Sequence, residues 1–190
     1  MLVAVIAVGI LIYQEVAITR NYNYTNMLET IAKGESSSNY NAYYDNARNS
    51  NDPAFTSMSV DEVLDWQKRY VADGSPSSAV GRYQFIRPTL EGLIEEQNID
   101  GSEVFSPELQ DRLAIALIQR RGVNDYMDGK ITREEFGNRL SQEWAALPRV
   151  TGDNSNESYY AGDGLNEARI SIDEIFASMD ALDQEEEDEE

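Results

Sequence analysis

Signals that begin helices recur along this chain, and they constrain its fold more than any other feature of the sequence. In three places a Ser or Thr is followed three residues later by Glu: Ser59 with Glu62, Thr132 with Glu135, and Ser171 with Glu174. This is the capping-box pattern, in which the two side chains bond the free backbone N–H groups of a first helical turn. The pattern predicts helices over about 59–71, 132–148 and 171–182.

Other segments add helices and one extended element. Ser106 and Pro107 place an N-cap residue before a proline suited to a first turn, so a helix should run from there to Arg120. Pro88 fits the first turn of another helix, and residues 80–86 before it read as a short strand or extended segment. With the helix described next, we expect about six helices and a small β element, a predominantly helical α+β fold.

A short helix leads into Glu35. Asn26 and Glu29 can form a capping box at its start, and Gly34 stands where helices usually stop. Glu35 should therefore follow directly after the helix, where the partial negative charge of the helix end and burial in a cleft raise the pKa of its carboxyl group. A carboxyl group that stays protonated near neutral pH can act as a general acid. The alternative is an ordinary solvated Glu. The apolar face of this helix is formed by Met27, Leu28, Ile31 and Ala32.

Composition narrows the chemistry that the chain can perform. The 190 residues include no Cys and no His, which excludes disulfides, thiol nucleophiles, imidazole triads and the usual metal sites. We therefore expect no metal and no cofactor. Acid–base chemistry would fall to carboxylates, Tyr, Lys or water, which favours glycoside chemistry. The net charge of −20 argues against a nucleic-acid partner, because such partners select clustered Lys and Arg.

We divide the chain into three parts: residues 1–20, one domain over residues 21–182, and an acidic tail over residues 183–190 that should be disordered. Residues 1–20 carry an apolar run. It is shorter than the roughly 20 residues of a typical spanning helix and lacks a clear cleavage site. We favour a membrane anchor or uncleaved export signal. A buried or partner-docking helix and a cleaved signal peptide are the alternatives.

Five segments are notable, in this order: MSVDEV at 58–63, GRYQFI at 81–86, FSPELQD at 105–111, LSQEWAALP at 140–148 and SYYAG at 158–162. GRYQFI resembles the G-x-Y-Q-F segment of lysozyme-like lytic enzymes. Together, over roughly residues 26–182, the segments resemble the bacteriophage lambda lysozyme (endolysin) family.

The resemblance implies a lysozyme-like fold and a peptidoglycan lytic transglycosylase. Members of that family cut the bond between N-acetylmuramic acid and N-acetylglucosamine and leave a 1,6-anhydro sugar. Their single catalytic Glu ends the first helix, and Glu35 occupies the matching place. The expected partners are peptidoglycan glycan strands, a membrane through residues 1–20, and virion proteins. The expected location is the virion or the host cell envelope, with the domain facing the periplasm.

Four further residues are candidates for substrate binding: Tyr83, Gln84, Gln110 and Tyr160. An aromatic ring can pack on a sugar face, and an amide can bond hydroxyl or N-acetyl groups. For Tyr83 and Gln84 the alternative is a core tyrosine and an amide that satisfies a buried backbone group. Gln110 lies one turn into its helix, where a solvated or structural role competes with contact to the cleft. Tyr160 would close one wall of the cleft.

Two other functions remain open at this stage. A muramidase-type hydrolase needs a second carboxylate about 5 Å from the acid for retention, or about 6.5–9.5 Å for inversion. Asp45 and Asp52, in the loop after Glu35, are the nearby candidates by sequence. The other function is that of a non-catalytic virion structural or wall-binding module that keeps the fold.

Overall fold

The computed structural model describes residues 22–46 and 52–183, and this part of the chain is a mainly helical domain with seven α-helices. Those ranges form α1 (Thr25–Ser36), α2 (Val60–Ala72), α3 (Arg87–Glu96), α4 (Pro107–Arg120), α5 (Val123–Met127), α6 (Arg133–Ser141) and α7 (Ile172–Asp180), with the 3-10 turns η1 (Phe55–Ser57) and η2 (Ala181–Asp183).

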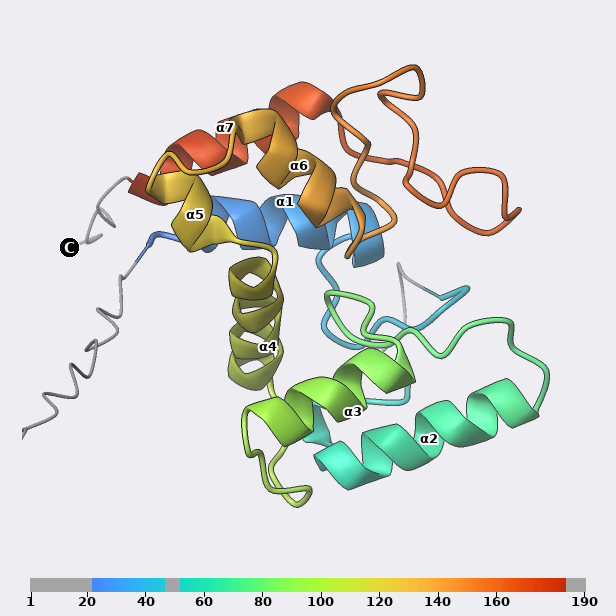
Figure 1. The fold of residues 1–190 in the computed structure, drawn as a ribbon. Helices are drawn as coiled ribbons and strands as arrows, with labels where there is room; N and C mark the ends of the chain where they lie inside the picture. The colour runs from blue at the N-terminus through green and yellow to red at the C-terminus, as the bar shows by residue number, and fades with distance from the viewer. Residues whose placement is uncertain (1–21, 47–51, 184–190) are drawn as a thin grey trace, which may run out of the picture.

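Helix α4 stands between two groups of helices (Figure 1). On one side α1, α5, α6 and α7 lie together, and on the other α2 and α3 lie side by side. The core extends through both groups, because all seven helices contribute fully buried side chains. Among the largest of them are Met27, Phe55, Leu90, Phe105, Leu113 and Phe136.

The predicted helix starts are confirmed where a capping pattern supported them. Capping boxes form at Ser59, Thr132 and Ser171, each with its Glu partner bonded back to the N-cap backbone. Ser106 caps α4 by accepting a hydrogen bond from the Leu109 N–H at 3.3 Å. Pro88 lies in the first turn of α3, as expected.

Other boundaries differ from the prediction. Asn26 does not cap α1, which begins at Thr25, where the backbone N–H donates to Asn23 Oδ1 at 3.1 Å. Helix α6 ends at Ser141 instead of continuing to Pro148, and Trp144 packs into the core from the turn that follows. The short helix α5 was not predicted, because five residues carry too little periodicity to be recognised.

The small β element is the main correction to the predicted α+β fold. Within the described residues the chain forms no strand, and its β-structure is limited to isolated bridges. Val80 and Phe85 exchange backbone hydrogen bonds of 3.1 and 2.8 Å, but the chain between them turns back at once. Gly81 has a φ of 77° and Gln84 a φ of 49°, left-handed values that close a tight turn and leave no length for a strand.

No helix within residues 22–46 and 52–183 is both long and apolar enough to cross a membrane. The expected apolar helix over residues 1–20 and nearly all of the predicted tail lie outside the described residues, so those expectations stay predictions.

Candidate active site

A cleft of about 1200 Å³ opens beside the end of α1. Its walls come from both helix groups: residues 33–35 and 37, segments within 43–46 and 76–89, the end of α4, and segments within 142–145 and 160–169. Four of the predicted site residues line this cleft, namely Glu35, Tyr83, Gln84 and Tyr160, and Asp45 lines it too. Its size suits an extended polymer better than a small metabolite.

Glu35 lies in the last turn of α1, not after it as predicted. The helix continues through Ser36 and closes at Ser37 and Ser38, whose left-handed φ values are 55° and 62°. The Ser36 hydroxyl donates to the Arg82 carbonyl at 2.7 Å, which ties this turn to the GRYQFI segment. The helix end and the cleft wall are therefore held together one residue from Glu35.

Gly34 does not stop the helix; it permits a close approach of two distant segments. A Cβ at this position would lie 2.8 Å from Ala146 Cβ and 2.8 Å from Ile170 Cγ1. Real Cβ atoms essentially never approach other heavy atoms so closely. Gly34 thus lets the segment around Ala146 pack against α1 and reach the Glu35 carboxyl group.

We expect Gly34→Ala to destabilise the domain by about 1–2 kcal/mol, because overpacking of about 1–3 kcal/mol outweighs the better helix propensity of Ala. Urea denaturation measures the change. Gly92→Ala in α3 is the matched control, since its Cβ would meet nothing within 4 Å and the substitution should stabilise by about 0.5–1 kcal/mol. If both changes stabilise the protein to the same extent, the close approach at Gly34 does not constrain the fold.

The Glu35 carboxyl group is partly buried, and its pKa is raised to about 7. Burial is the largest cause of this shift in pKa. Two weaker influences lower the pKa: a hydrogen bond of 2.9 Å from the Ala146 N–H to Glu35 Oε1, and the positive charge of Arg169. The raised pKa means that Glu35 keeps its proton to higher pH than an ordinary Glu, and the protonated state is the one from which a general acid works.

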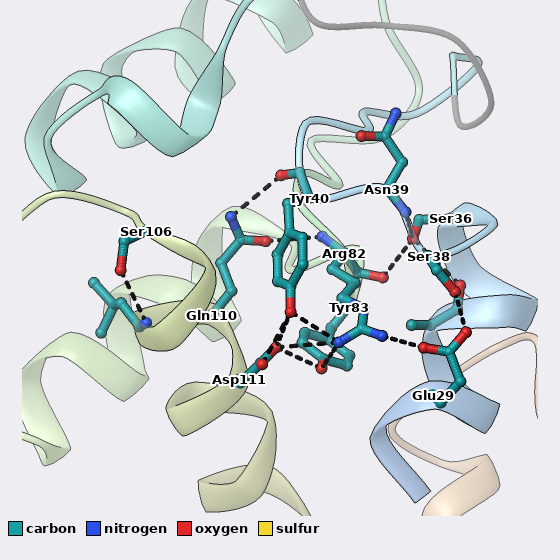
Figure 2. Close-up of polar contacts among 12 residues, drawn as sticks. Glu29, Ser36, Ser38, Asn39, Tyr40, Arg82, Tyr83, Ser106, Gln110 and Asp111 are labelled. Atoms are coloured by element: carbon teal, nitrogen blue, oxygen red, sulfur yellow. Dashed lines mark hydrogen bonds and ion pairs between the residues drawn. The ribbon is translucent and has the colours of Figure 1, made fainter. Parts of the chain in front are cut away.

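Tyr83 lines the cleft but is only 1% exposed, so its ring forms part of the floor. Its hydroxyl donates to Asp111 Oδ1 at 2.7 Å, and Tyr40 donates to the same carboxylate at 2.9 Å (Figure 2). Arg82 lies against both tyrosines, pairs with Asp111 and forms an ion pair with Glu29 (Figure 2). This network lies behind the cleft and fixes the position of the Tyr83 ring.

Gln84 and Tyr160 present polar atoms at the cleft. Gln84 is partly buried, and its amide nitrogen donates to the Gly81 carbonyl at 2.9 Å. Tyr160 is 40% exposed, and its hydroxyl donates to the Gln142 carbonyl at 2.7 Å. That bond ties the loop carrying Tyr160 to the segment after α6, which forms one wall.

Gln110 does not line the cleft, and the structure gives it a supporting role instead. It is fully buried, and its side-chain oxygen accepts a hydrogen bond from the backbone N–H of Arg82 at 2.8 Å. Its amide nitrogen donates to the Tyr40 carbonyl at 3.2 Å (Figure 2) and to the Phe105 carbonyl at 3.1 Å. Because the oxygen and the nitrogen of the buried amide both bind backbone groups, neither atom is available to bind a sugar.

Several cleft residues were missed by the sequence reasoning. Arg121 and Glu143 form an ion pair of 2.7 Å in one wall, and Arg169 lies near Glu35. Glu143 stands inside the LSQEWAALP segment, which was the signal available for it. Asp52, considered as a second carboxylate, is not among the residues that line the cleft, and no group of acids in the described chain is arranged to hold a metal ion.

Comparison with known proteins identifies the family of this chain. Residues 25–163 match the family described as Endolysin. Searches of curated proteins and of solved structures returned no match. The match covers most of the chain and spans the segments that bring Glu35, Tyr83, Gln84 and Tyr160 to one cleft. The chain therefore belongs to the endolysin family, whose members are phage enzymes that degrade the bacterial cell wall.

Proposed function

We propose that this endolysin is a lytic transglycosylase that cleaves the β-1,4 bond between N-acetylmuramic acid and N-acetylglucosamine. The observation that carries the proposal is the partly buried Glu35 carboxyl group, with a pKa raised to about 7, in a cleft large enough for a glycan strand. Gln84 and Tyr160 would contact the strand at the rim, and Tyr83 would shape the floor.

One carboxyl group suffices for this reaction. Protonated Glu35 gives its proton to the glycosidic oxygen, and the bond from that oxygen to the anomeric carbon breaks. The resulting carboxylate takes the proton of the 6-hydroxyl group of the muramic acid, whose oxygen attacks the anomeric carbon. The products are a 1,6-anhydro sugar and a free 4-hydroxyl, and Glu35 ends in its protonated state.

A hydrolase is the second candidate, and the carboxylates of the cleft decide its plausibility. Asp45 and Glu143 line the cleft together with Glu35. Glu143 is bound to Arg121 at 2.7 Å and only 10% of its side chain is exposed, so it is poorly placed to activate a water or attack a sugar. Asp45 is the remaining candidate for a second catalytic carboxylate. The transglycosylase needs neither.

Product analysis tests the proposal directly. The full-length protein is incubated with purified murein sacculi, and the soluble fragments are analysed by mass spectrometry. Anhydro-muropeptides are the expected products. Fragments with reducing ends, heavier by one water, would show a hydrolase. Intact sacculi after treatment with folded protein would instead favour a wall-binding module without catalytic activity.

The dependence of activity on pH follows from the raised pKa of Glu35. Because the reaction starts from the protonated acid, kcat/KM should be constant between about pH 5 and 6. It should fall through a midpoint near pH 7, tenfold for each further pH unit. A transglycosylase with a single catalytic carboxyl needs no ionised partner, so we expect no loss of activity towards pH 5. A bell-shaped profile would contradict the single-residue mechanism and support a second carboxylate.

A further inference from the structure

The cleft contains three basic side chains that differ in their partners: Lys33, Arg121 and Arg169. Lys33 forms an ion pair with Glu174 at 2.6 Å, and Arg121 forms one with Glu143 at 2.7 Å. Within residues 22–46 and 52–183, Arg169 forms no ion pair; its guanidinium makes one long hydrogen bond, of 3.4 Å, to the Gly34 carbonyl. In a chain with a net charge of −20, a cleft cation that forms no ion pair among the described residues calls for an explanation.

The backbone places Arg169 beside the proposed catalytic acid. Its N–H donates to the Ala146 carbonyl at 2.8 Å, while the N–H of the same Ala146 donates to Glu35 Oε1 at 2.9 Å. The guanidinium contacts Gly34, the residue before Glu35, and its charge lowers the Glu35 pKa. Arg169 lies beyond residue 163, where the match to the family ends.

The protonation state of Glu35 determines whether the Arg169 charge is balanced. When Glu35 is ionised, its carboxylate is the nearby counter-charge. When Glu35 is protonated, as the proposed reaction requires, the guanidinium has no acidic partner among the described residues. An exposed, planar guanidinium in that state is suited to bind a carboxylate of the substrate.

The chemistry of peptidoglycan indicates which carboxylate this is. The N-acetylated sugars carry no charge, and the lactyl carboxyl group of the muramic acid is consumed in the amide bond to the stem peptide. The free carboxylates therefore belong to the stem peptide, which hangs from the sugar whose glycosidic bond Glu35 would protonate. Arg169 lies near Glu35, and in the proposed reaction Glu35 acts on the sugar that carries this peptide, so a free carboxylate of the peptide would be close to the guanidinium.

We propose that Arg169 binds a free carboxylate of the stem peptide on the muramic acid at the cleavage site, so that the enzyme prefers peptide-bearing strands with free carboxylates. This inference rests on the proposed function, since it assumes that the cleft holds peptidoglycan. A bound carboxylate would also neutralise Arg169 and so reduce its effect on Glu35, which would keep its proton until the transfer. Arg169 then acts as a specificity-determining residue.

Binding to an inactive protein tests this role without cleavage. The full-length Glu35→Gln variant retains the size of the acid in a neutral form. It is titrated by calorimetry with three tetrasaccharides: one with stem peptides bearing free carboxylates, one with the same peptides amidated, and one without peptides whose lactyl carboxyl groups are amidated. We expect the first to bind about five- to tenfold more tightly than the amidated ligand.

A second substitution in the Glu35→Gln protein tests whether Arg169 is the side chain that causes this preference. Adding Arg169→Gln should remove the difference between the free and amidated ligands, and adding Arg169→Lys should retain part of it. Adding Lys33→Gln is the matched control, because Lys33 lines the same cleft but is paired with Glu174, and the preference should persist. Equal binding of the free and amidated ligands, or a preference that survives Arg169→Gln, would overturn the inference alone. No binding of any ligand, together with intact sacculi, would overturn the proposed function as well.

Discussion

Glu35→Gln should lower the turnover of peptidoglycan by about 10³- to 10⁴-fold while the fold remains intact. A positioned general acid or base contributes about 10²- to 10⁴-fold, and here one residue would serve in both roles, so the loss should lie towards the upper end. Gln has the size of Glu and its amide oxygen can still accept the hydrogen bond from Ala146, but it cannot transfer a proton. Release of soluble fragments from sacculi measures the turnover, and circular dichroism checks the fold.

Asp45→Asn is the matched control, because Asp45 is a carboxylate in the same cleft without an assigned role in the transglycosylase reaction. Its activity should stay within about threefold of the unmodified protein, whereas a hydrolase that used Asp45 would lose at least as much as a single catalytic group contributes, about 10²-fold. An active Glu35→Gln protein would place the chemistry on another residue.

Glu35→Gln should also change the free energy of unfolding, and the raised pKa of Glu35 determines the direction of that change. The pKa in the folded protein is about 7 against an ordinary 4.5, so ionising Glu35 opposes folding once the pH exceeds 4.5. The cost grows up to pH 7 and is constant above it. Glu35→Gln should therefore be more stable by about 2–3 kcal/mol at pH 8 and nearly unchanged at pH 4. An equal effect at both pH values would show that the Glu35 carboxyl group is not sheltered from water.

The parts of the fold that could be predicted are those determined by local sequence. The helix starts at Ser59, Thr132 and Ser171 were predicted because a capping box is complete within four residues. The end of α1 was placed too early, because the role of Gly34 depends on Ala146 and Ile170. Those residues are distant in sequence, and no periodicity connects them to α1.

The candidate site shows the same division between local and distant information. The place of Glu35 near a helix end and the candidacy of Tyr83 and Gln84 could be read from short segments. The Ala146 N–H that bonds Glu35 lies 111 residues away in the chain, and Arg169, whose charge acts on Glu35, is more distant still, so neither could be foreseen. Gln110 was predicted to bind the substrate because the backbone groups of Tyr40 and Arg82 that its amide binds come from two other segments. The local sequence around Gln110 does not reveal them.

The polar network around Arg82 connects these distant parts, since it joins α1, α4 and the loop between α1 and η1 (Figure 2). Only 13% of the Arg82 side chain is exposed, and its guanidinium lies 4.8 Å from the ring centroid of Tyr40. Its backbone carbonyl holds the Ser36 hydroxyl, one residue from the proposed acid. The network therefore affects both the stability of the domain and the geometry of the cleft.

We expect Arg82→Met to destabilise the domain by about 2–4 kcal/mol, because it leaves Asp111 without its cation in a half-buried setting. Without Arg82, the Tyr83 ring and the end of α1 should be positioned less firmly. This should lower kcat by about tenfold in the protein that remains folded. Arg82→Lys should have effects between those of Arg82→Met and the unmodified protein. A single ammonium group cannot pair with both Glu29 and Asp111 as the forked guanidinium does. Urea denaturation at pH 6 and turnover of sacculi measure the two effects.

Arg112→Met provides the matched control for this substitution. Arg112 also lies near an acid, with an ion pair of 3.0 Å to Glu103, but 54% of its side chain is exposed. Exposed pairs of this kind contribute about 0–1 kcal/mol, so the variant should keep nearly full stability and activity. If Arg82→Met costs no more than Arg112→Met, the network behind the cleft does not hold the site together. The position of Glu35 would then depend on Gly34 and Ala146 alone.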